Sequence, residues 1–250
     1  MAGTRLPDTP YDDQGLPLAL GVIGCGAMGA ALAELFSARG FPVHLAGGRR
    51  RTAEALAARL PSAVAADPET VAAMARLLIL ATPVHASRTE VAPRIGHLLG
   101  GKVLVDVSNP LPSDLHGTGY HSAAELIADA FPKSPIVKGL NCVSARQVRA
   151  FARGGPPPTV PVTGDDREAK QCVTRLLRTA GFDVADAGPL RNSRWIEGLT
   201  ELLRRIGQEE GLGDAVGFRL LRLGGEPPED AWQDSRTSGP AFVPRKENRT

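Results

Sequence analysis

Three glycines near the N-terminus have the spacing that a dinucleotide-binding turn requires. They follow an apolar run at residues 18–23 and precede apolar residues at helical spacing. Between a strand and a helix, the first glycine makes the tight turn, the second admits a pyrophosphate and the third allows close packing. The N–H groups at the helix start then hold the phosphates. We therefore predict dinucleotide binding, rather than a tight turn without a ligand, through Gly24, Cys25, Gly26, Ala27, Met28 and Gly29.

The residues about twenty positions after the glycines decide which dinucleotide this turn prefers. An NAD site places an Asp or Glu there, whereas this chain has Gly47, Gly48, Arg49, Arg50 and Arg51. Guanidinium groups suit the planar recognition of phosphate. We predict that Gly48 and the three arginines receive the 2′-phosphate of NADP(H), with Arg49 as the principal contact. The alternative is that these arginines only begin a solvated helix.

Two buried strands are predicted to end in polar residues at the same edge of a sheet. The run at 77–81 leads into Thr82, Pro83 and Val84, and the run at 102–107 leads into Ser108 and Asn109. In a doubly wound sheet the carboxyl ends of the strands form the ligand crevice. We therefore predict that all five residues lie beside the dinucleotide.

Candidates for a catalytic side chain are few. Asn141 follows a third strand at 136–138, and we predict that it hydrogen-bonds the carboxamide or the electron acceptor. His85 and His121 could donate to an acceptor ring, and Lys138 could pair with an anionic acceptor, but surface or structural roles are alternatives for each. Hydride transfer between a nicotinamide and a flavin needs chiefly two rings held face to face. No Ser-Tyr-Lys or His-Asp set is therefore required, and no residue is predicted with certainty to be catalytic.

The elements that must position these residues alternate between strands and helices. This alternation predicts an α/β fold: a Rossmann-type doubly wound parallel sheet with a small C-terminal α+β part. The expected strands cover residues 18–23, 41–46, 77–81, 102–107, 136–138, 159–163 and 182–185. The expected helices run from the third glycine to 39, and over 52–60, 68–74, 87–98, 123–131, 167–180 and 194–208.

The domain organisation follows from the breaks in this pattern. We predict a flexible N-terminal arm at 1–17 and an NADP-binding Rossmann domain at 18–150. A C-terminal strand-helix part at 151–221 completes the acceptor site, and a disordered tail occupies 222–250. The helix at 194–208 has an apolar stripe, read as a core or dimer contact, that consists of Trp195, Leu199, Leu202, Leu203 and Ile206.

Composition excludes several classes of function. The 250 residues carry 29 Lys and Arg against 27 Asp and Glu, and only 4% are aromatic, so nucleic acid is not an expected partner. The cysteines at 25, 142 and 172 are an odd number without metal-ligand spacing, which favours free thiols and no metal site. No apolar run is long enough for a signal peptide or a membrane span. We therefore expect a cytoplasmic protein with a small-molecule electron acceptor.

Several sequence blocks resemble two families that share one fold. The segments GGRRR, VPVTGDDREAK, DAGPLRNSRWIEGLTELL and GLGDAVGFRLL resemble the NADP reductases that use the deazaflavin coenzyme F420. The segments DVSNP, SAAELIADAFP and IVKGLNCVSA resemble the cytosolic oxidoreductase domain of the six-transmembrane (STEAP) metalloreductases. Together these matches cover residues 18–221.

This resemblance implies a Rossmann domain that binds NADPH and passes hydride to a flavin-type ring over the nicotinamide. By the same resemblance, the glycine turn and Arg49 hold the cofactor, while residues 82–85 and Asn141 lie near the nicotinamide. The chain departs from both families in one way each. Gly48 replaces the phosphate-binding Ser that precedes the arginine, and the printed sequence has no six-helix haem domain.

The leading hypothesis is an NADP(H)-dependent oxidoreductase with FAD, FMN or a deazaflavin as acceptor. A second reading is a ferric or cupric reductase that acts through bound flavin. A third is a non-catalytic NADP(H)-binding redox sensor that contacts a partner through its tail. A fourth, dehydrogenation of an imino or 2-hydroxy acid, expects a catalytic Lys or His in the second domain, where none stands out. A homodimer through 194–221 is expected by analogy.

Overall fold

One eight-stranded sheet organises the protein. The computed structural model describes residues 19–222, and the strand order is β3-β2-β1-β4-β5-β6-β7-β8. Neighbouring strands are parallel from β3 to β6, β7 is antiparallel to β6, and β8 is parallel to β7. The predicted doubly wound α/β fold is confirmed. The strands are β1 (Leu20–Ile23), β2 (Val43–Ala46), β3 (Ala63–Ala65), β4 (Leu77–Leu80), β5 (Val103–Asp106), β6 (Ile136–Lys138), β7 (Thr159–Gly164) and β8 (Asp183–Asp186).

The chain reverses its direction across the sheet between β1 and β4. Leu20 of β1 lies opposite Val43 of β2 on one side and opposite Leu77 of β4 on the other. At such a switch point the loops leaving the two strands diverge and leave a crevice at their carboxyl ends. The glycine turn after β1 and the loop after β4 therefore open into the same crevice.

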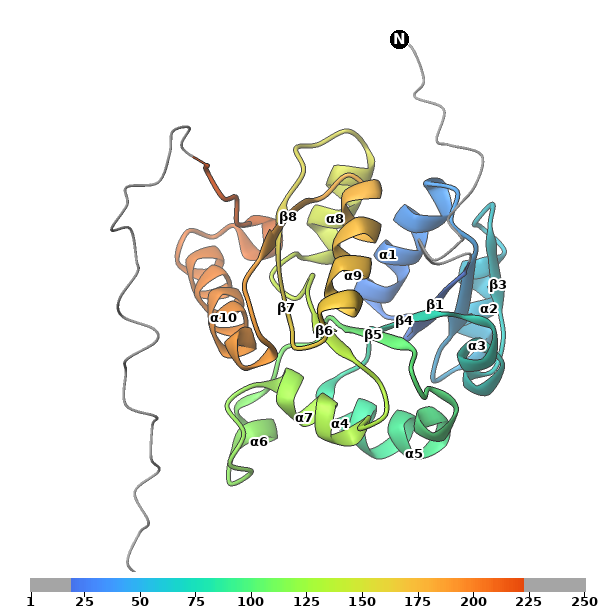
Figure 1. The fold of residues 1–250 in the computed structure, drawn as a ribbon. Coiled ribbons are helices and arrows are strands. Elements are labelled where there is room, and N and C mark those ends of the chain that lie inside the picture. Colours follow the sequence, from blue (N-terminus) through green and yellow to red (C-terminus); the bar gives the residue numbers. More distant parts are fainter. Residues whose placement is uncertain (1–18, 223–250) are drawn as a thin grey trace, which may run out of the picture. The chain divides into compact units, whose positions relative to one another are not determined.

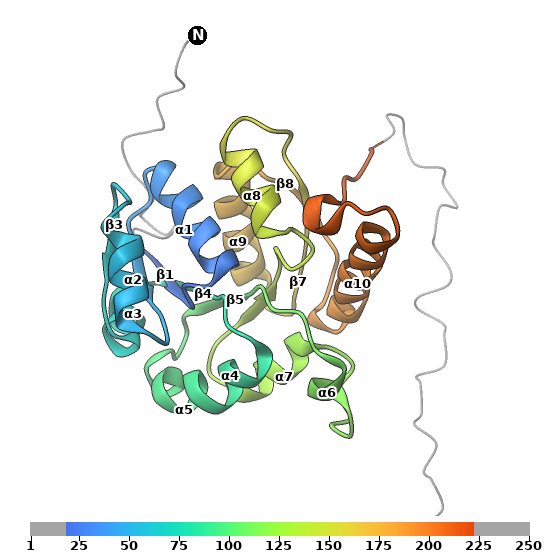
Figure 2. The same cartoon turned by 180° about the vertical axis from the view of Figure 1, so that it is seen from behind.

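Helices cover both faces of the sheet, and each face has its own apolar core (Figures 1 and 2). One core joins α1, α2, α8 and α9 to the sheet, and the other joins α3, α4, α5 and α7. Burial on both faces explains the continuous apolar runs of β1 and β4. The helices are α1 (Ala27–Ala38), α2 (Arg50–Ala57), α3 (Pro68–Met74), α4 (Val84–Ala86), α5 (Ala92–Ile95), α6 (Pro112–Leu115), α7 (Ala123–Ala130), α8 (Ala145–Ala152), α9 (Arg167–Thr179) and α10 (Ser193–Glu209).

Side-chain caps start three of the predicted helices where the sequence places them. Asp67 accepts a hydrogen bond from the Thr70 N–H at the start of α3, and Asp166 accepts one from Ala169 at the start of α9. Ser122 caps α7 by accepting from the Glu125 N–H. Each cap satisfies one of the N–H groups that the first helical turn leaves without a partner.

One strand and two α-helices are absent from the prediction, and one predicted helix is divided. The short strand β3 and the helices α6 and α8 were not expected. The helix predicted at 87–98 begins three residues earlier and passes through a π-helical turn, Ser87–Val91, and a final 3₁₀ turn, Gly96–Leu98. In α8, Ser144 and Gln147 form a capping box, a signal that was present in the sequence.

The proposed boundary at residue 150 falls inside one continuous sheet. β7 and β8 lie beyond it and extend the sheet past β6, and the described residues up to Arg219 belong to one compact unit. A division into a cofactor part and an acceptor part is therefore a proposal about function rather than about separate folding. The arm predicted at 1–17, and the predicted tail from residue 223 onward, lie outside the described residues.

Candidate functional site

Two of the three glycines in the turn after β1 leave no room for a side chain. Gly24 has a φ of +106°, and a Cβ on it would lie 2.4 Å from the Ala81 carbonyl oxygen. A Cβ on Gly29 would lie 1.8 Å from the Gly24 carbonyl oxygen. Both distances are far shorter than van der Waals contact, so the turn and the packing of α1 against it require glycine at these positions.

Gly26 has the opposite environment, because it faces open space. A Cβ there would meet no atom within 4 Å, and both Gly26 and Ala27 are exposed. Gly26 is the N-cap of the twelve-residue α1, and no side chain caps the first turn of this helix. Free N–H groups and the positive end of the helix dipole attract phosphate. The turn therefore fits a pyrophosphate at the position that the sequence predicts.

The side chains of the three predicted arginines differ in whether they already bind another group of the protein. Arg50 Nε forms an ion pair with Glu54 Oε1 at 2.8 Å, one turn along α2. The side chains of Arg49, the N-cap of α2, and Arg51 have no hydrogen bond or ion pair among the described residues. Gly48 is exposed, and a Cβ on it would meet nothing within 4 Å. Two guanidinium groups after β2 therefore have no partner among the described residues.

Cys25 connects the glycine turn with this basic segment. Its side chain lies beside Gly47, and it lines a pocket of about 360 Å³ together with Arg51 and Arg59. Burial raises the pKa of the Cys25 thiol. At neutral pH, Cys25 is therefore a neutral, half-buried part of this pocket's wall rather than a nucleophile.

The loop after β4 contributes less side-chain chemistry than the sequence suggests. Thr82 Oγ1 lies 2.6 Å from Ser87 Oγ, so the two hydroxyls share a hydrogen bond. Pro83 and His85 are exposed. Val84 is 1% exposed and packs into the core on the face of α3 and α7, so only its backbone is available to a cofactor.

The ends of β5 and β6 are joined through two asparagines. Asn109 Nδ2 donates to the Asn141 carbonyl oxygen at 2.9 Å, and Asn141 Nδ2 donates to Asn109 Oδ1 at 3.1 Å. Asn141 Nδ2 also lies 3.0 Å from the Ile196 carbonyl oxygen and 3.1 Å from Thr200 Oγ1 on α10. The amide nitrogen of Asn141 is thus surrounded by acceptors.

The Asn141 side-chain oxygen has no hydrogen-bond partner among the described residues, although it is buried. Exchanging the oxygen and nitrogen would point the oxygen at the carbonyl of Ile196, which fixes the orientation of the amide. The preceding residue, Leu140, is fully buried with a φ of +62°. That conformation costs a non-glycine residue energy, and such strain clusters at functional sites.

Ser108 is also buried, and its backbone and side chain have different environments. Its carbonyl oxygen accepts from Lys138 Nζ at 2.6 Å, and its own Oγ has no partner among residues 19–222. Ser108 lies at the predicted edge of the sheet. Its backbone takes part in a buried charge network there.

A cavity of about 590 Å³ opens beside the glycine turn at the carboxyl ends of β5 and β6. Met28 of α1 and Asn141 lie in its wall, and most of the remaining wall comes from α10 and residues 213–216, which belong to the part at 151–221 predicted to complete the acceptor site, although no single residue there was predicted as a site residue. No sequence signal marks Thr200 as a site residue, because only its contact with Asn141 in the fold brings it to the cavity. The wall residues are Met28, Val107, Asn109, Asn141, Cys142, Val143, Ser144, Gln147, Thr200, Leu203, Arg204, Gln208, Gly213, Asp214 and Val216.

Lys138 is not available to an anionic acceptor, contrary to one of the predicted roles. Its Nζ lies 2.8 Å from Asp106 Oδ2 and 2.9 Å from Glu197 Oε1, and its side chain is completely buried. Burial raises the pKa of Glu197, while Lys138 and the Ala123 N–H oppose that rise. This buried charge network of Asp106, Lys138 and Glu197 joins β5, β6 and α10.

The predicted stripe on α10 divides between the core and the surface. Leu199 and Leu203 pack against the core, whereas Trp195, Leu202 and Ile206 are 66%, 54% and 39% exposed. The guanidinium of Arg194 lies 4.6 Å from the Trp195 ring centroid. The exposed part of the stripe remains available to a partner.

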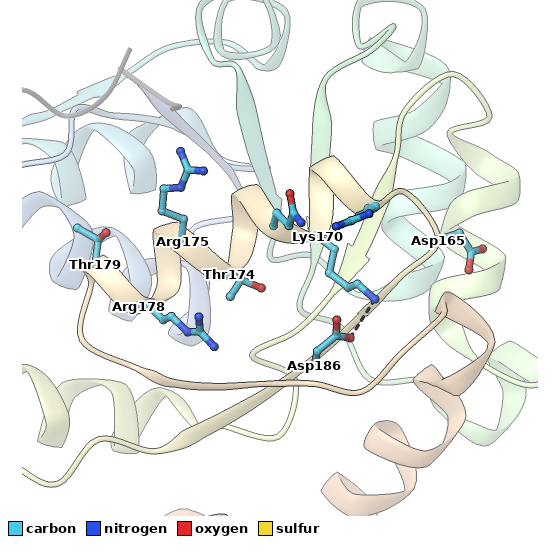
Figure 3. Close-up of a pocket in the computed structure, with 9 residues that line it drawn as sticks. Asp165, Lys170, Thr174, Arg175, Arg178, Thr179 and Asp186 are labelled. Atoms are coloured by element: carbon cyan, nitrogen blue, oxygen red, sulfur yellow. Dashed lines mark ion pairs between the residues drawn. The ribbon is translucent and has the colours of Figure 1, made fainter. Parts of the chain in front are cut away.

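A second cavity, of about 780 Å³, lies along α9 and β8 and is larger than the cavity at the glycine turn (Figure 3). Its wall is charged, and Lys170 reaches across it to Asp186 with a 2.9 Å ion pair. None of the predicted cofactor residues lies in this wall. Size alone therefore does not identify the cofactor site.

Comparison with known proteins agrees with this geometry. Residues 19–110 match the family model of the coenzyme F420-dependent NADP oxidoreductases. A crystal structure of a protein described as an F420-dependent NADP reductase, from Arthrobacter sp. FB24, is 27% identical with a TM-score of 0.73, over 82% of this chain and 100% of that one. An imine reductase from Pseudomonas sp., 17% identical with a TM-score of 0.61 over 78% of this chain and 64% of that one, shares the fold.

Metalloreductases are also related to this chain. Rat metalloreductase STEAP3 is 30% identical over 180 residues, which are 72% of this chain and 36% of that protein. Human metalloreductase STEAP2 is 33% identical over 127 residues, 51% of this chain and 25% of that protein. The chain thus spans about a third of the length of these relatives or less. Within residues 19–222, no helix combines the length and apolar character needed to cross a bilayer.

The glycine turn, the crevice at the switch point and these similarities lead to one assignment. Residues 19–110 form an NADP oxidoreductase domain of the coenzyme F420-dependent type, and the chain as a whole is similar to an F420-dependent NADP reductase and to the STEAP metalloreductases.

Proposed function

We propose that this protein transfers hydride between NADPH and a flavin or deazaflavin ring. The observation that carries the proposal is the cavity beside the glycine turn, which has Asn141 in its wall. The side-chain oxygen of Asn141 is buried and has no partner among the described residues. An unpartnered buried acceptor costs about 1–3 kcal/mol, which a donor on a ligand would recover. An amide N–H of a bound nicotinamide or flavin-type ring supplies such a donor.

The adenosine end of the crevice favours NADP(H) over NAD(H). Arg49 and Arg51 have no intramolecular partner among the described residues, and no carboxylate follows β2 to repel a 2′-phosphate. Gly48 leaves open space where the resembling reductases have a Ser. We assign the phosphate to Arg49 and Arg51, because Arg50 is paired with Glu54.

The walls of the cavity suit ring stacking rather than acid-base catalysis. When bound, the nicotinamide supplies the hydride chemistry. Val107, Val143 and Leu203 provide apolar surface, and Asn141 provides an acceptor that orients a ring. Burial raises the pKa of Cys142 to about 11, so this thiol stays neutral and does not compete as a nucleophile. Orientation in a site with little water is then the main contribution of the protein.

The residues after position 150 complete the acceptor side in this proposal. Thr200, Leu203 and Arg204 of α10 form the wall opposite the glycine turn, and Gly213, Asp214 and Val216 close it. We also propose that two copies of the chain associate through the exposed face of α10, where Trp195, Leu202 and Ile206 present apolar surface to solvent.

The similarity to metalloreductases favours a second candidate, reduction of ferric or cupric ions through a bound flavin. NADPH oxidation with deazaflavin, FAD, FMN and a ferric chelate offered in turn distinguishes the candidates. Oxidation by a ring acceptor alone supports direct hydride transfer, and oxidation by the chelate only when flavin is present supports metal reduction. Tight NADPH binding without oxidation by any acceptor would favour a redox sensor instead.

A further inference from the structure

Glu197 lies where four elements of the fold meet. Its carboxylate pairs with Lys138 Nζ at 2.9 Å, and its side chain is 5% exposed. The Ala123 N–H donates to Oε2 at 2.9 Å, and the Ala124 N–H donates to Oε1 at 3.2 Å. These two N–H groups are the first of α7, so the carboxylate of α10 adds to the cap that Ser122 provides at the third.

The partner of Glu197 is itself held at the ends of two strands. Lys138, the last residue of β6, also binds Asp106 Oδ2 at 2.8 Å and the Ser108 carbonyl oxygen at 2.6 Å. A buried ion pair often contributes little net stability, because desolvation offsets its attraction. The main effect of the buried charge network is therefore to fix the position of α10 rather than to add stability.

The same helix holds the amide of Asn141. Ile196 immediately precedes Glu197, and its carbonyl oxygen lies 3.0 Å from Asn141 Nδ2. Thr200, one turn further on, places its Oγ1 3.1 Å from the same nitrogen. Asn141 follows Lys138 by three residues, across the strained Leu140. Lys138 thus binds Glu197, and Asn141 binds Ile196 and Thr200, so both residues hold the same turn of α10.

We infer that Glu197 is a positioning residue for the cavity: it locks the first turns of α10 onto β6 and α7, so that Ile196 and Thr200 hold the Asn141 amide with its Oδ1 free for a ligand. The change in kinetics that this inference predicts rests on the proposed function. Its structural consequence, the orientation of Asn141, does not depend on which acceptor is used.

Glu197→Gln is the informative variant, because glutamine keeps the volume while losing the charge. Lys138 then keeps Asp106 as its ion-pair partner, which favours a folded variant. The glutamine NH2 group cannot accept from either Lys138 or the α7 N–H groups. We expect kcat/KM for the ring acceptor to fall by about 10- to 100-fold, because a small misplacement of a positioning group has effects of that size. NADPH affinity should change less than about twofold, because the glycine turn and arginines bind the rest of the cofactor.

A double-mutant cycle separates positioning from general destabilisation. If Glu197 acts through Asn141, then Glu197→Gln combined with Asn141→Ala should lose no more than Asn141→Ala alone. The fluorescence of bound NADPH, which reports the nicotinamide environment, should show the same non-additivity without any acceptor present. Thr200→Val, which removes only the hydroxyl next to Asn141, provides a second test of the same contact.

Glu69→Gln is the matched control, because Glu69 pairs with Arg94 on the surface, between α3 and α5. It should leave the kinetics and the fluorescence unchanged. Independent, multiplicative losses in the cycle would overturn the inference, as would a Glu197→Gln variant that melts earlier but has unchanged fluorescence and kcat/KM. If none of the offered acceptors supports oxidation of NADPH by the wild-type protein, the proposed function fails. The fluorescence cycle still decides the role of Glu197.

Discussion

Asn109 and Asn141 hold each other at the ends of β5 and β6. The Asn109 Nδ2 donates to the Asn141 carbonyl oxygen, and the Asn141 Nδ2 donates to Asn109 Oδ1, over 2.9 and 3.1 Å. Each amide therefore fixes the orientation of the other. The consequence is that one specific atom, Asn141 Oδ1, is left without a partner among the described residues.

Replacing Asn109 tests this mutual orientation. Asn109→Asp keeps an acceptor for Asn141 Nδ2 but sets a carboxylate against the Asn141 carbonyl oxygen, which lies 2.9 Å from the present donor. We expect this variant to be less stable than Asn109→Ala, by about 1–3 kcal/mol in the free energy of unfolding. Urea denaturation of both variants measures the difference. An Asn109→Asp protein as stable as the wild type would rule out the assigned orientation.

Gly26 and Gly29 should respond differently to alanine. A methyl group on Gly26 meets no protein atom within 4 Å, so Gly26→Ala should melt near the wild-type temperature while NADPH affinity falls tenfold or more, about 1.4 kcal/mol or more. Gly29→Ala should instead lower the melting temperature, because its Cβ would lie 1.8 Å from the Gly24 carbonyl oxygen. Calorimetry and NADPH titration measure both effects. Unchanged NADPH binding by Gly26→Ala would remove the pyrophosphate from this turn.

Arg49 and Arg50 provide a matched pair for the 2′-phosphate. Arg49→Ala should weaken NADPH binding by about 1.5–3 kcal/mol, the range for a hydrogen bond to a charged group, and leave NADH binding almost unchanged. Arg50→Ala should cost less than about 1 kcal/mol, because Arg50 is exposed and paired with Glu54. Fluorescence titration with both cofactors tests this. Equal losses for NADPH and NADH on replacing Arg49 would contradict the phosphate assignment.

The thiol of Cys142 should titrate far above neutral pH. Burial raises its pKa to about 11, so about one thiol in a thousand is ionised at pH 8. Because the thiolate is the reactive form, alkylation of Cys142 should keep rising about tenfold per pH unit past pH 9, where an ordinary cysteine levels off. Mass spectrometry of iodoacetamide-treated native protein can follow this residue separately. A plateau near pH 8.5 would show an exposed, ordinary thiol.

The exposed face of α10 should govern self-association. If two copies meet through Trp195, Leu202 and Ile206, then Leu202→Glu should convert a dimer into a monomer without changing the melting temperature of the monomer. Sedimentation velocity over a range of concentrations measures the change. Glu201→Gln, on the adjacent position, serves as the control. A wild-type protein that stays monomeric at high concentration would refute the proposed dimer.

Much of the fold could be predicted because local signals and the global arrangement agree. The glycine turn, the apolar runs of β4 and β5 and the caps at Asp67, Ser122 and Asp166 are each visible within a few residues. The strand β3 has only three residues and lies at the edge of the sheet, so no period marks it. The helix α8 was missed even though Ser144 and Gln147 carry a capping box.

The site was harder to predict than the fold, because its decisive contacts join distant residues. Asn141 was a candidate from its place after β6, but its pairing with Thr200 spans 59 residues. Glu197 has only apolar and small neighbours in the sequence, and nothing there indicates that it meets Lys138. Lys138 itself looked available to a ligand, because no sequence pattern reveals a buried partner.

Direct transfer of hydride from NADPH to a ring acceptor is tested most directly by a stereospecific isotope effect. NADPH carrying deuterium in either the 4R or the 4S position is mixed with the protein and its fastest ring acceptor in a stopped-flow instrument. In the proposed site the nicotinamide has one orientation, so we predict that only one of the two labels slows oxidation. Equal rates with both labels and unlabelled NADPH in a single turnover, or no oxidation by any ring acceptor, would contradict the account.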